Sequence, residues 1–406
     1  MTSRARHGMT LVEMLVATAM TLIIMGIVAQ LFGFLAGTLS RSRETISMSA
    51  DARSVANLLR RDLAGLTVKT VPPVPADGEA GYLEILEGAN TDASAGFGQL
   101  AGDCDDVLML TTRGLDRPFL GRFGSSGSIE SPVAEVAWFC LPSPNASQTV
   151  PGTTLYTLYR RQLLVMDYVG QTPFENSLDN SISGRLPNDD YDLSLRADGS
   201  LLRPNSLGDL TRREWRFLHN LSGTASAVGY PYNGTVANLV SYGVLGGSRQ
   251  GEDVVLTDVL AFDVRVFDPR APLRTTSATA VEPGDPGYGS ATAAGVTGAY
   301  VDLGSGSTAT DLLASATAKS KLTRVYDTWS THYESNGIDE DGVYGSDQGT
   351  NGVDDNNNGI VDEDAEQETA PPYTTPLRGL EVRIRVYEPT SRQVRQVTVR
   401  HTFVPH

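Results

Sequence analysis

The sequence has few of the residues and patterns on which enzymes, disulfide-rich scaffolds and nucleic-acid-binding proteins depend. Its 406 residues include two cysteines, Cys104 and Cys140, and five histidines. The histidines are scattered without metal-ligand spacing, and no Ser/His/Asp or Cys/His arrangement stands beside recognisable motif residues. The formal net charge of −16 argues against nucleic-acid binding, which requires basic patches. We therefore expect neither an enzyme nor a nucleic-acid-binding protein.

What the sequence does contain is a long uncharged run near its start. Residues 14–40 carry no charged side chain, and a membrane-spanning helix needs only about 20 mainly apolar residues. The run is also longer than the roughly 7–15-residue apolar core of a secretory signal. Glu13 stands at its front edge, where a carboxylate in lipid is costly and usually functional. We expect a transmembrane helix over residues 14–39 and a partner for Glu13.

A short basic leader ends in Gly8, and residues 8–13 read Gly-Met-Thr-Leu-Val-Glu. This stretch resembles the class III signal of type IV pilins and type II secretion pseudopilins. The resemblance implies that prepilin peptidase cuts after Gly8, that Met9 is N-methylated, and that Glu13 docks the subunit into a filament. About one helical turn separates Met9 from Glu13, so the carboxylate can pair with the free amine of its own chain or of a neighbour. Met9 replaces the commoner Phe, and the alternative is a plain signal anchor with a chance Glu.

The helix is expected to continue beyond the membrane as far as residue 66. No proline occurs between residues 40 and 66, and prolines at 72, 73 and 75 then forbid continuation. One helix over residues 9–66 would measure roughly 87 Å at ~1.5 Å per residue. The alternative is a separate linker helix after the membrane span. The apolar positions of the second half are Ala52, Val55, Leu59, Leu63 and Leu66, and Arg53, Arg60, Arg61 and Asp62 fit a solvated face.

The body that follows is expected to be an antiparallel β-domain. In the hairpin at its end, apolar Val382, Ile384 and Val386 alternate with charged residues, so we expect one face against the helix and a charged, solvated face. The fold class is therefore α+β and pilin-like: a long N-terminal helix, transmembrane in its first half, packed on an antiparallel sheet with large loop insertions. Segments rich in β-branched and aromatic residues predict strands over residues 82–86, 107–112, 133–141, 155–160, 163–166, 254–267, 380–387 and 393–404.

The order of these strands resembles the J-type minor pseudopilin of type II secretion. The likeness rests on residues 138–141, 158–161, 260–268 and 376–384. It implies a structural subunit of the pseudopilus tip, which packs against other minor pseudopilins through their N-terminal helices. Such a protein crosses the inner membrane once and has its body in the periplasm. The alternatives are a minor pilin of a type IV pilus and a membrane-anchored, calcium-dependent binding module.

Three regions divide the chain: a leader over residues 1–8, the helix over 9–66 and the periplasmic body over 72–406. The body is expected to carry insertions over residues 171–251, 271–320 and 332–368. The first is rich in Asn, Ser, Asp and Gly, and the second in Ala, Gly, Ser and Thr. Within the second, residues 291–303 are the best candidate for an extra strand.

The third insertion holds twelve acidic residues and neither Lys nor Arg. Residues 354–362 follow the D-x-[DN]-x-[DN]-G spacing of calcium loops, in which alternate side chains converge on one cation. Ala365 stands where an EF-hand has its last Glu, so the segment is more similar to the loops of thrombospondin type 3 repeats. Residues 336–342 are a weaker second candidate, and the alternative is a solvated acidic loop without metal. The expected Ca²⁺ ligands are the side chains of Asp354, Asn356, Asn358, Asp362 and Glu363 and the carbonyl of Ile360.

The two cysteines are expected to be neighbours on adjacent strands. Pairing residues 107–112 with 133–141 so that Thr112 faces Val133 also brings Asp105 opposite Cys140. Cys104 is then one step away, a separation that a disulfide can bridge if the Cβ vectors converge. The far side of the membrane is usually oxidising. We therefore predict a Cys104–Cys140 disulfide, with two buried free thiols as the alternative.

Overall fold

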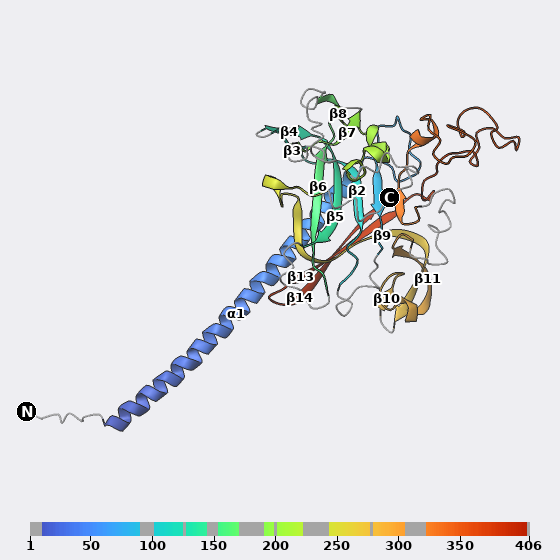
Figure 1. The fold of residues 1–406 in the computed structure, drawn as a ribbon. Helices are drawn as coiled ribbons and strands as arrows, with labels where there is room; N and C mark the ends of the chain where they lie inside the picture. Colours follow the sequence, from blue (N-terminus) through green and yellow to red (C-terminus); the bar gives the residue numbers. More distant parts are fainter. Residues whose placement is uncertain are drawn as a thin grey trace, which may run out of the picture.

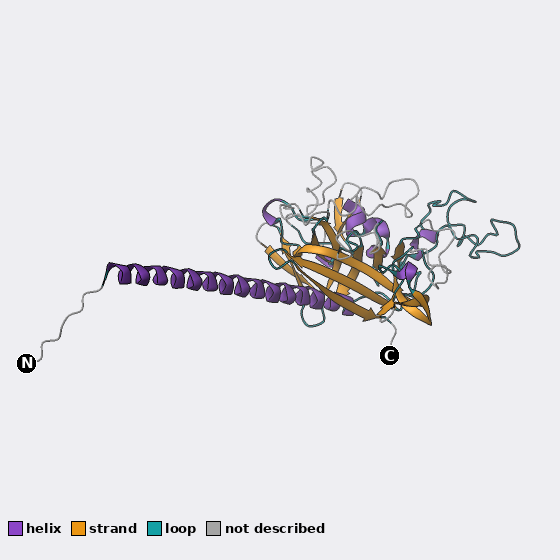
Figure 2. Ribbon diagram, turned by 90° about the horizontal axis from the view of Figure 1, so that it is seen from below, coloured by secondary structure: helices purple, strands orange, loops and turns teal. Residues whose placement is uncertain are grey.

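The molecule consists of one long helix and a β-rich body, in a computed structural model. The C-terminal half of the helix lies against the body, and its N-terminal half projects away from it (Figure 1). Seen from below, the helix lies under the large sheet, and loops and short helices lie on the other side (Figure 2). The structure describes residues 10–89, 101–124, 127–143, 153–169, 191–198, 201–221, 243–276, 279–304 and 322–403.

The helix α1 (Leu11–Ala64) is unbroken over 54 residues. It begins after the N-cap residue Thr10 and ends at the C-cap residue Gly65, ahead of the prolines that forbid continuation. Its first part is long and apolar enough to cross a membrane, with a mean hydropathy of 2.3. Burial against the body begins at Met48. The expected long helix is therefore confirmed, and the alternative of a separate linker helix is wrong.

The body is built on one large antiparallel sheet. Its strands lie in the order β12-β1-β2-β5-β6-β9-β13-β14, and β10 and β11 also pair with β9. The predicted α+β, pilin-like fold class is confirmed by this sheet and the helix packed on it. The strands are β1 (Leu83–Leu86), β2 (Val107–Arg113), β5 (Val133–Pro142), β6 (Tyr156–Leu164), β9 (Val254–Thr276), β10 (Thr279–Val281), β11 (Thr292–Val301), β12 (Val325–Asp327), β13 (Gly379–Glu388) and β14 (Gln393–Thr402).

Smaller elements cover one side of the sheet. Strand β3 (Phe119–Phe123) pairs with β4 (Gly127–Ser131), β7 (Leu195–Asp198) pairs with β8 (Leu201–Pro204), and α2 is the short helix Phe217–Leu221. All eight predicted strand segments fall on strands, although two of them merge into β6. The extra strand expected within residues 291–303 is β11. The sequence did not predict β3, β4, β7, β8, β10 or β12, which are short or lie in insertions.

The sheet is buried on both faces. Toward α1, Leu108, Phe262 and Val382 pack with Leu59 of the helix in one apolar cluster. On the opposite face, neighbouring strand residues such as Met109 form a second cluster that α2 helps to cover. Fully burying one such side chain contributes about 1.5–3 kcal/mol. The apolar stripe of α1 therefore supplies most of the attraction between the helix and the sheet.

Asp62 does not lie on the solvated face of the helix, contrary to expectation. It is buried, and its two carboxylate oxygens accept hydrogen bonds from Arg160 Nη2 and Nε, both at 2.7 Å. Trp138 Nε1 also donates to Asp62 Oδ2 at 2.9 Å. The error arises because β5 and β6 present an indole and a guanidinium to the last turns of the helix. A sequence pattern for one helix does not contain that contact.

The charged face of β13 is covered rather than solvated, which corrects the expectation for this strand of the hairpin, whereas Arg395 and Arg400 of β14 are exposed. Strand β9 runs on to Thr276, and the chain then returns through β10 and β11. This return brings Glu282 and Asp285 onto Arg383, with N–O distances of 2.6 Å to each. Glu381 of the same face is fully buried and pairs with Arg383 at 2.6 Å. The described part of the second insertion thus covers β13 and supplies the carboxylates that pair with Arg383.

We predict that Asp62→Ala strongly destabilises the body. The change leaves the Arg160 guanidinium buried without its carboxylate, and breaking one partner of a buried pair costs about 3–5 kcal/mol. Urea unfolding of the chain from Ser40 onward measures the loss. Asp51→Ala is the matched control, because Asp51 is an exposed acidic residue of the same helix. Equal midpoints for the two variants would contradict the anchoring role of Asp62.

Candidate functional site

The first candidate functional element is the N-terminal signal. Gly8 and Met9 lie outside the described residues, so the geometry starts at Thr10. Glu13 Oε2 accepts hydrogen bonds from Thr10 N at 2.9 Å and from Thr10 Oγ1 at 3.0 Å, and Glu13 N donates to Thr10 Oγ1 at 3.3 Å. This reciprocal capping box secures the helix start.

The first part of α1 is apolar on all sides. Its most apolar window is 0% buried, so no described part of the body covers it. A helix that is hydrophobic all round is normally buried in lipid or among other helices. This surface can therefore lie in a membrane or against the helices of neighbouring subunits. Its large exposed side chains include Leu15, Val16, Met20, Leu22, Ile23, Ile24, Met25, Ile27, Val28, Leu31, Phe32, Phe34 and Leu35.

The acidic insertion brings most of the predicted calcium ligands together. Asp354 accepts hydrogen bonds from the backbone N–H groups of Asn358 and Gly359, at 3.0 and 2.7 Å. Glu363 Oε1 accepts from the side-chain amides of Asn356 and Asn358, at 2.6 and 2.5 Å. Gly359 has φ +92°, the left-handed turn that such a loop requires of this residue.

Two predicted calcium ligands have different partners. Asp362 Oδ1 accepts a hydrogen bond from Gly352 N at 3.0 Å. Ile360 contributes an N–H that donates to Asn358 Oδ1 at 2.9 Å. The structure therefore brings Asp354, Asn356, Asn358 and Glu363 into one hydrogen-bonded turn, and uses Asp362 to close a wider loop that begins before it.

That wider loop occurs twice. Gly337 N donates to Asp347 Oδ1 at 2.9 Å, in the same way as Gly352 N donates to Asp362. The side chain of Asn336 accepts from the N–H two residues on at 2.8 Å, and Asn351 does the same at 2.8 Å. Both turns start with Asn-Gly, a β-branched residue and Asp. The sequence analysis noted the first turn as a weaker candidate but missed that the two are repeats.

The cysteines lie close together as free thiols. Both are buried, and Cys104 hydrogen-bonds with Cys140. The strand register differs by one residue from the expected one, because Thr112 faces Ala134 and not Val133. The observed register pairs Leu108 with Trp138, and both side chains face α1 in the core. A one-residue slip would turn one strand over. The disulfide itself stays a prediction.

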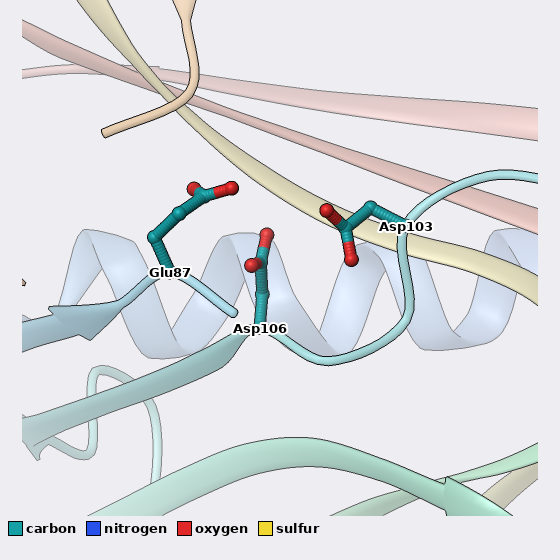
Figure 3. Close-up of side chains that lie close together, drawn as sticks. All are labelled: Glu87, Asp103 and Asp106. Atoms are coloured by element: carbon teal, nitrogen blue, oxygen red, sulfur yellow. The ribbon is translucent and has the colours of Figure 1, made fainter. Parts of the chain in front are cut away.

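The sequence analysis missed a buried group of three carboxylates, Glu87, Asp103 and Asp106. Their oxygen atoms lie within 4.8 Å of one another, and Figure 3 shows the three side chains turned toward one another. Glu87 follows β1, whereas Asp103 and Asp106 lie in the segment that enters β2. The donor set could bind a metal ion. The one available signal was the polar run Asp-Cys-Asp-Asp of residues 103–106, directly before an apolar strand.

Burial and mutual repulsion make these carboxylates hard to ionise. Burial, together with Asp106, raises the pKa of Asp103 to about 11. Burial, followed by the charges of Asp302, Asp103 and Asp263, raises the pKa of Glu87 well above its usual range. Burial and the nearby Glu87 do the same to the pKa of Asp106. Burial and mutual repulsion therefore both disfavour the charged form of this group.

A second buried charge cluster, on the opposite side of the sheet, is fully paired. Glu84 accepts hydrogen bonds from Arg213 at 2.6 Å, Arg216 at 2.7 Å and His219 at 3.0 Å. Asp327 pairs with Arg216 at 2.7 Å. Burial alone would raise the pKa of Glu84, but Arg213, His219 and Arg216 together lower it well below its usual range. This cluster fastens the first insertion to the sheet.

Comparison with known proteins identifies the N-terminal element alone. Residues 3–29 match the prokaryotic N-terminal methylation motif. Neither a curated protein nor a solved structure matches the chain. The motif is the class III prepilin signal of type IV pilin-like proteins, and it indicates a membrane-anchored subunit that prepilin peptidase processes. Such subunits are typically structural rather than enzymatic. The match ends at residue 29, before the body, so it does not define the kind of pilin-like subunit.

We predict that Cys104 and Cys140 form a disulfide, because the two buried thiols are neighbours and the far side of a membrane, where we expect the body to lie, is usually oxidising. Alkylation of the denatured, unreduced protein should label neither cysteine, and prior reduction should expose both to the reagent. Mass spectrometry of the labelled chain gives the count. Two labels without reduction would show that the pair stays as buried thiols.

Proposed function

We propose that this protein is a minor pseudopilin of a type II secretion system, a structural subunit of the pseudopilus tip. The observation that carries the proposal is α1 itself. One helix has a capped carboxylate at its start, an all-round apolar first half, and a second half docked on an antiparallel sheet. This combination suits a subunit that waits in the inner membrane and then enters a filament by its helix.

The processing site follows from the signal. Prepilin peptidase would cut after Gly8 on the cytoplasmic side and leave Met9 as an N-methylated first residue. Glu13 would then reach the amine of Met9 or that of the adjacent subunit, and either pairing lowers the cost of a carboxylate in lipid. The body, over residues 72–406, would lie in the periplasm.

A place at the tip, in few copies, fits the charge of the body. The chain carries a formal net charge of −16, and the acidic insertion contributes twelve carboxylates, of which all but Glu366 and Glu368 are at least partly exposed. Many identical bodies side by side would repel one another. The partners that fit are other minor pseudopilins, with which contact is made along the apolar helices. A minor pilin of a type IV pilus is the competing assignment, and the neighbouring genes discriminate the two.

We also propose that the acidic insertion binds Ca²⁺ on the far side of the membrane. Two repeated turns, each closed from Gly N to an Asp carboxylate, support this proposal. Asp354, Asn356, Asn358 and Glu363 would supply side-chain oxygens to the second turn, and Ile360 its carbonyl. Asp362 would join them after a change of partner. A calcium-dependent contact with another protein is then a second role of the body.

Replacing Glu13 tests the filament proposal. Glu13→Leu removes the charge and keeps the anchor, so cleavage after Gly8 and membrane insertion should persist. Co-purification with the partner pseudopilins should fall severalfold, because the subunit has lost its docking carboxylate. Mass spectrometry of the N-terminus and quantitative pull-down report the two outcomes separately.

The control is Glu44→Leu, which changes a carboxylate of the same helix beyond the apolar run. It should assemble normally. If Glu13→Leu assembles as well as Glu44→Leu, the helix is only an anchor, and the calcium-dependent binding module becomes the better assignment.

Replacing two residues of the insertion tests the calcium proposal. Asp354→Ala combined with Asp362→Ala should abolish binding by the second turn, because a proposed ligand and the carboxylate that closes the loop are both lost. Calorimetric titration of chelator-treated protein with Ca²⁺ gives the change in the number of bound ions. Asp364→Ala, an exposed acidic residue of the same segment, is the matched control. Identical titration curves for wild type and the double variant would leave only a solvated acidic loop.

A further inference from the structure

The three buried carboxylates outside the acidic insertion have the spacing of a metal site. The ligand oxygens of Glu87, Asp103 and Asp106 all lie within 4.8 Å of one another. Oxygens on opposite sides of a Ca²⁺ ion bound at about 2.4 Å are separated by about 4.8 Å. Even three oxygens at that limiting spacing have a common centre about 2.8 Å from each, so a small side-chain adjustment would bring all three to one bound Ca²⁺ ion.

Glu87 gives an independent reason to expect a ligand. Its side chain is 1% exposed, and among the described residues neither carboxylate oxygen accepts a hydrogen bond. The nearest cation is Arg324, whose Nη2 lies 3.6 Å from Glu87 Oε1, beyond normal hydrogen-bond distance. Figure 3 shows this carboxylate directed into the group. A buried carboxylate without a donor is costly unless an ion or a proton satisfies it.

The other two carboxylates are held in place by the backbone. Asp106 accepts hydrogen bonds from Gly88 N at 3.1 Å and from Val264 N at 2.7 Å. Asp103 Oδ1 accepts from Asp105 N at 3.1 Å. A carboxylate oxygen that accepts one hydrogen bond retains a second lone pair. Asp103 and Asp106 therefore present preorganised oxygens, and only Glu87 would have to adjust.

The charge around the group also calls for a cation. Asp263 and Asp302 are buried close enough to disfavour ionisation of Glu87, and Arg324 is the cation that opposes them there. Asp302 already pairs with Arg265 at 3.0 Å. Three facing carboxylates with one distant guanidinium leave an excess of negative charge, which a divalent ion would neutralise.

We propose that Glu87, Asp103 and Asp106 form a buried Ca²⁺ site that ties the end of β1 to β9. The donors are all carboxylate oxygens, which hard cations prefer, and zinc would select nitrogen or sulfur ligands. Mg²⁺ usually keeps several waters and demands a near-ideal octahedron. A group with every ligand side chain buried suits the more readily dehydrated and geometrically tolerant Ca²⁺.

The proposed site lies beside the point where two strands stop pairing. Direct pairing of β6 with β9 ends at Val259, and beyond it the segment before β2 is hydrogen-bonded to β9. Gly102 N donates to Leu260 O at 2.8 Å, and Phe262 N donates to Asp103 O at 2.7 Å. An ion bound to Glu87 and Asp103 would connect the β1 end to this segment. It would thereby close the sheet around α1.

The test uses the full chain in detergent with Asp339→Ala, Asp347→Ala, Asp354→Ala and Asp362→Ala, so that neither turn of the acidic insertion contributes to binding. After chelator treatment, Ca²⁺ should bind at one ion per chain and raise the melting temperature. Adding Glu87→Gln should weaken binding at least about tenfold, because even outer-shell changes alter metal affinity by 10–100-fold. In chelator, the Glu87→Gln chain should melt no lower than its parent, because a neutral amide replaces a repelled carboxyl group.

Asp103→Asn is a second variant with the same expected loss of binding, should Glu87→Gln fail to fold. Glu135→Gln is the control, since Glu135 is a buried carboxylate that accepts from Tyr82 and Ser194 instead. It should lower the melting temperature but keep the shift on adding Ca²⁺. No Ca²⁺-induced shift in the parent, or an unchanged shift in Glu87→Gln, would overturn the proposal. A shift with Mg²⁺ but not with Ca²⁺ would overturn the choice of ion.

Discussion

One unbroken helix must satisfy two different solvents, and the rest of the structure follows from that constraint. The first half of α1 has apolar side chains all round, whereas the second half has one apolar stripe and a polar back. Because α1 remains one continuous helix across this change, the sheet packs against its second half only. Asp62 marks the completed docking, because its carboxylate is buried only when β5 and β6 bring Trp138 and Arg160 against it.

The body also buries several charged side chains, and ion pairing offsets part of the cost of removing them from water. Glu84 with Arg213 and Arg216, and Arg383 with Glu282 and Asp285, each fasten an insertion to the sheet through short ion pairs. Such pairs add little net stability over apolar contacts, but the loss of one partner is costly. They therefore specify where the insertions dock. The carboxylates around Glu87 depart from this pattern, since carboxylates face one another instead of bases.

Local sequence patterns were sufficient to predict the long helix and the main strands. They could not predict contacts between residues that are far apart in the sequence. The period of α1 and the alternation of β13 both identify their buried apolar faces correctly, because that information lies within a few residues. The error at Asp62 and the error on the charged face of β13 share one cause. In each, a segment about a hundred residues away supplies the opposite charge. The Glu87 group was missed for the same reason, since Glu87 and Asp103 meet only through the sheet.

A bound cation would have different effects in the two acidic regions. In the acidic insertion, water reaches most of the carboxylates, so calcium would mainly order loops that have no apolar core. In the Glu87 group, water is excluded, and an ion would offset the repulsion between facing carboxylates inside the sheet on which α1 packs. The calcium concentration beyond the membrane would then affect the body in two places. It would order a surface that can bind partners, and it would stabilise the sheet at the Glu87 group. Because α1 docks on that sheet, the inner site would couple the environment of the body to the firmness with which the body is joined to its filament helix.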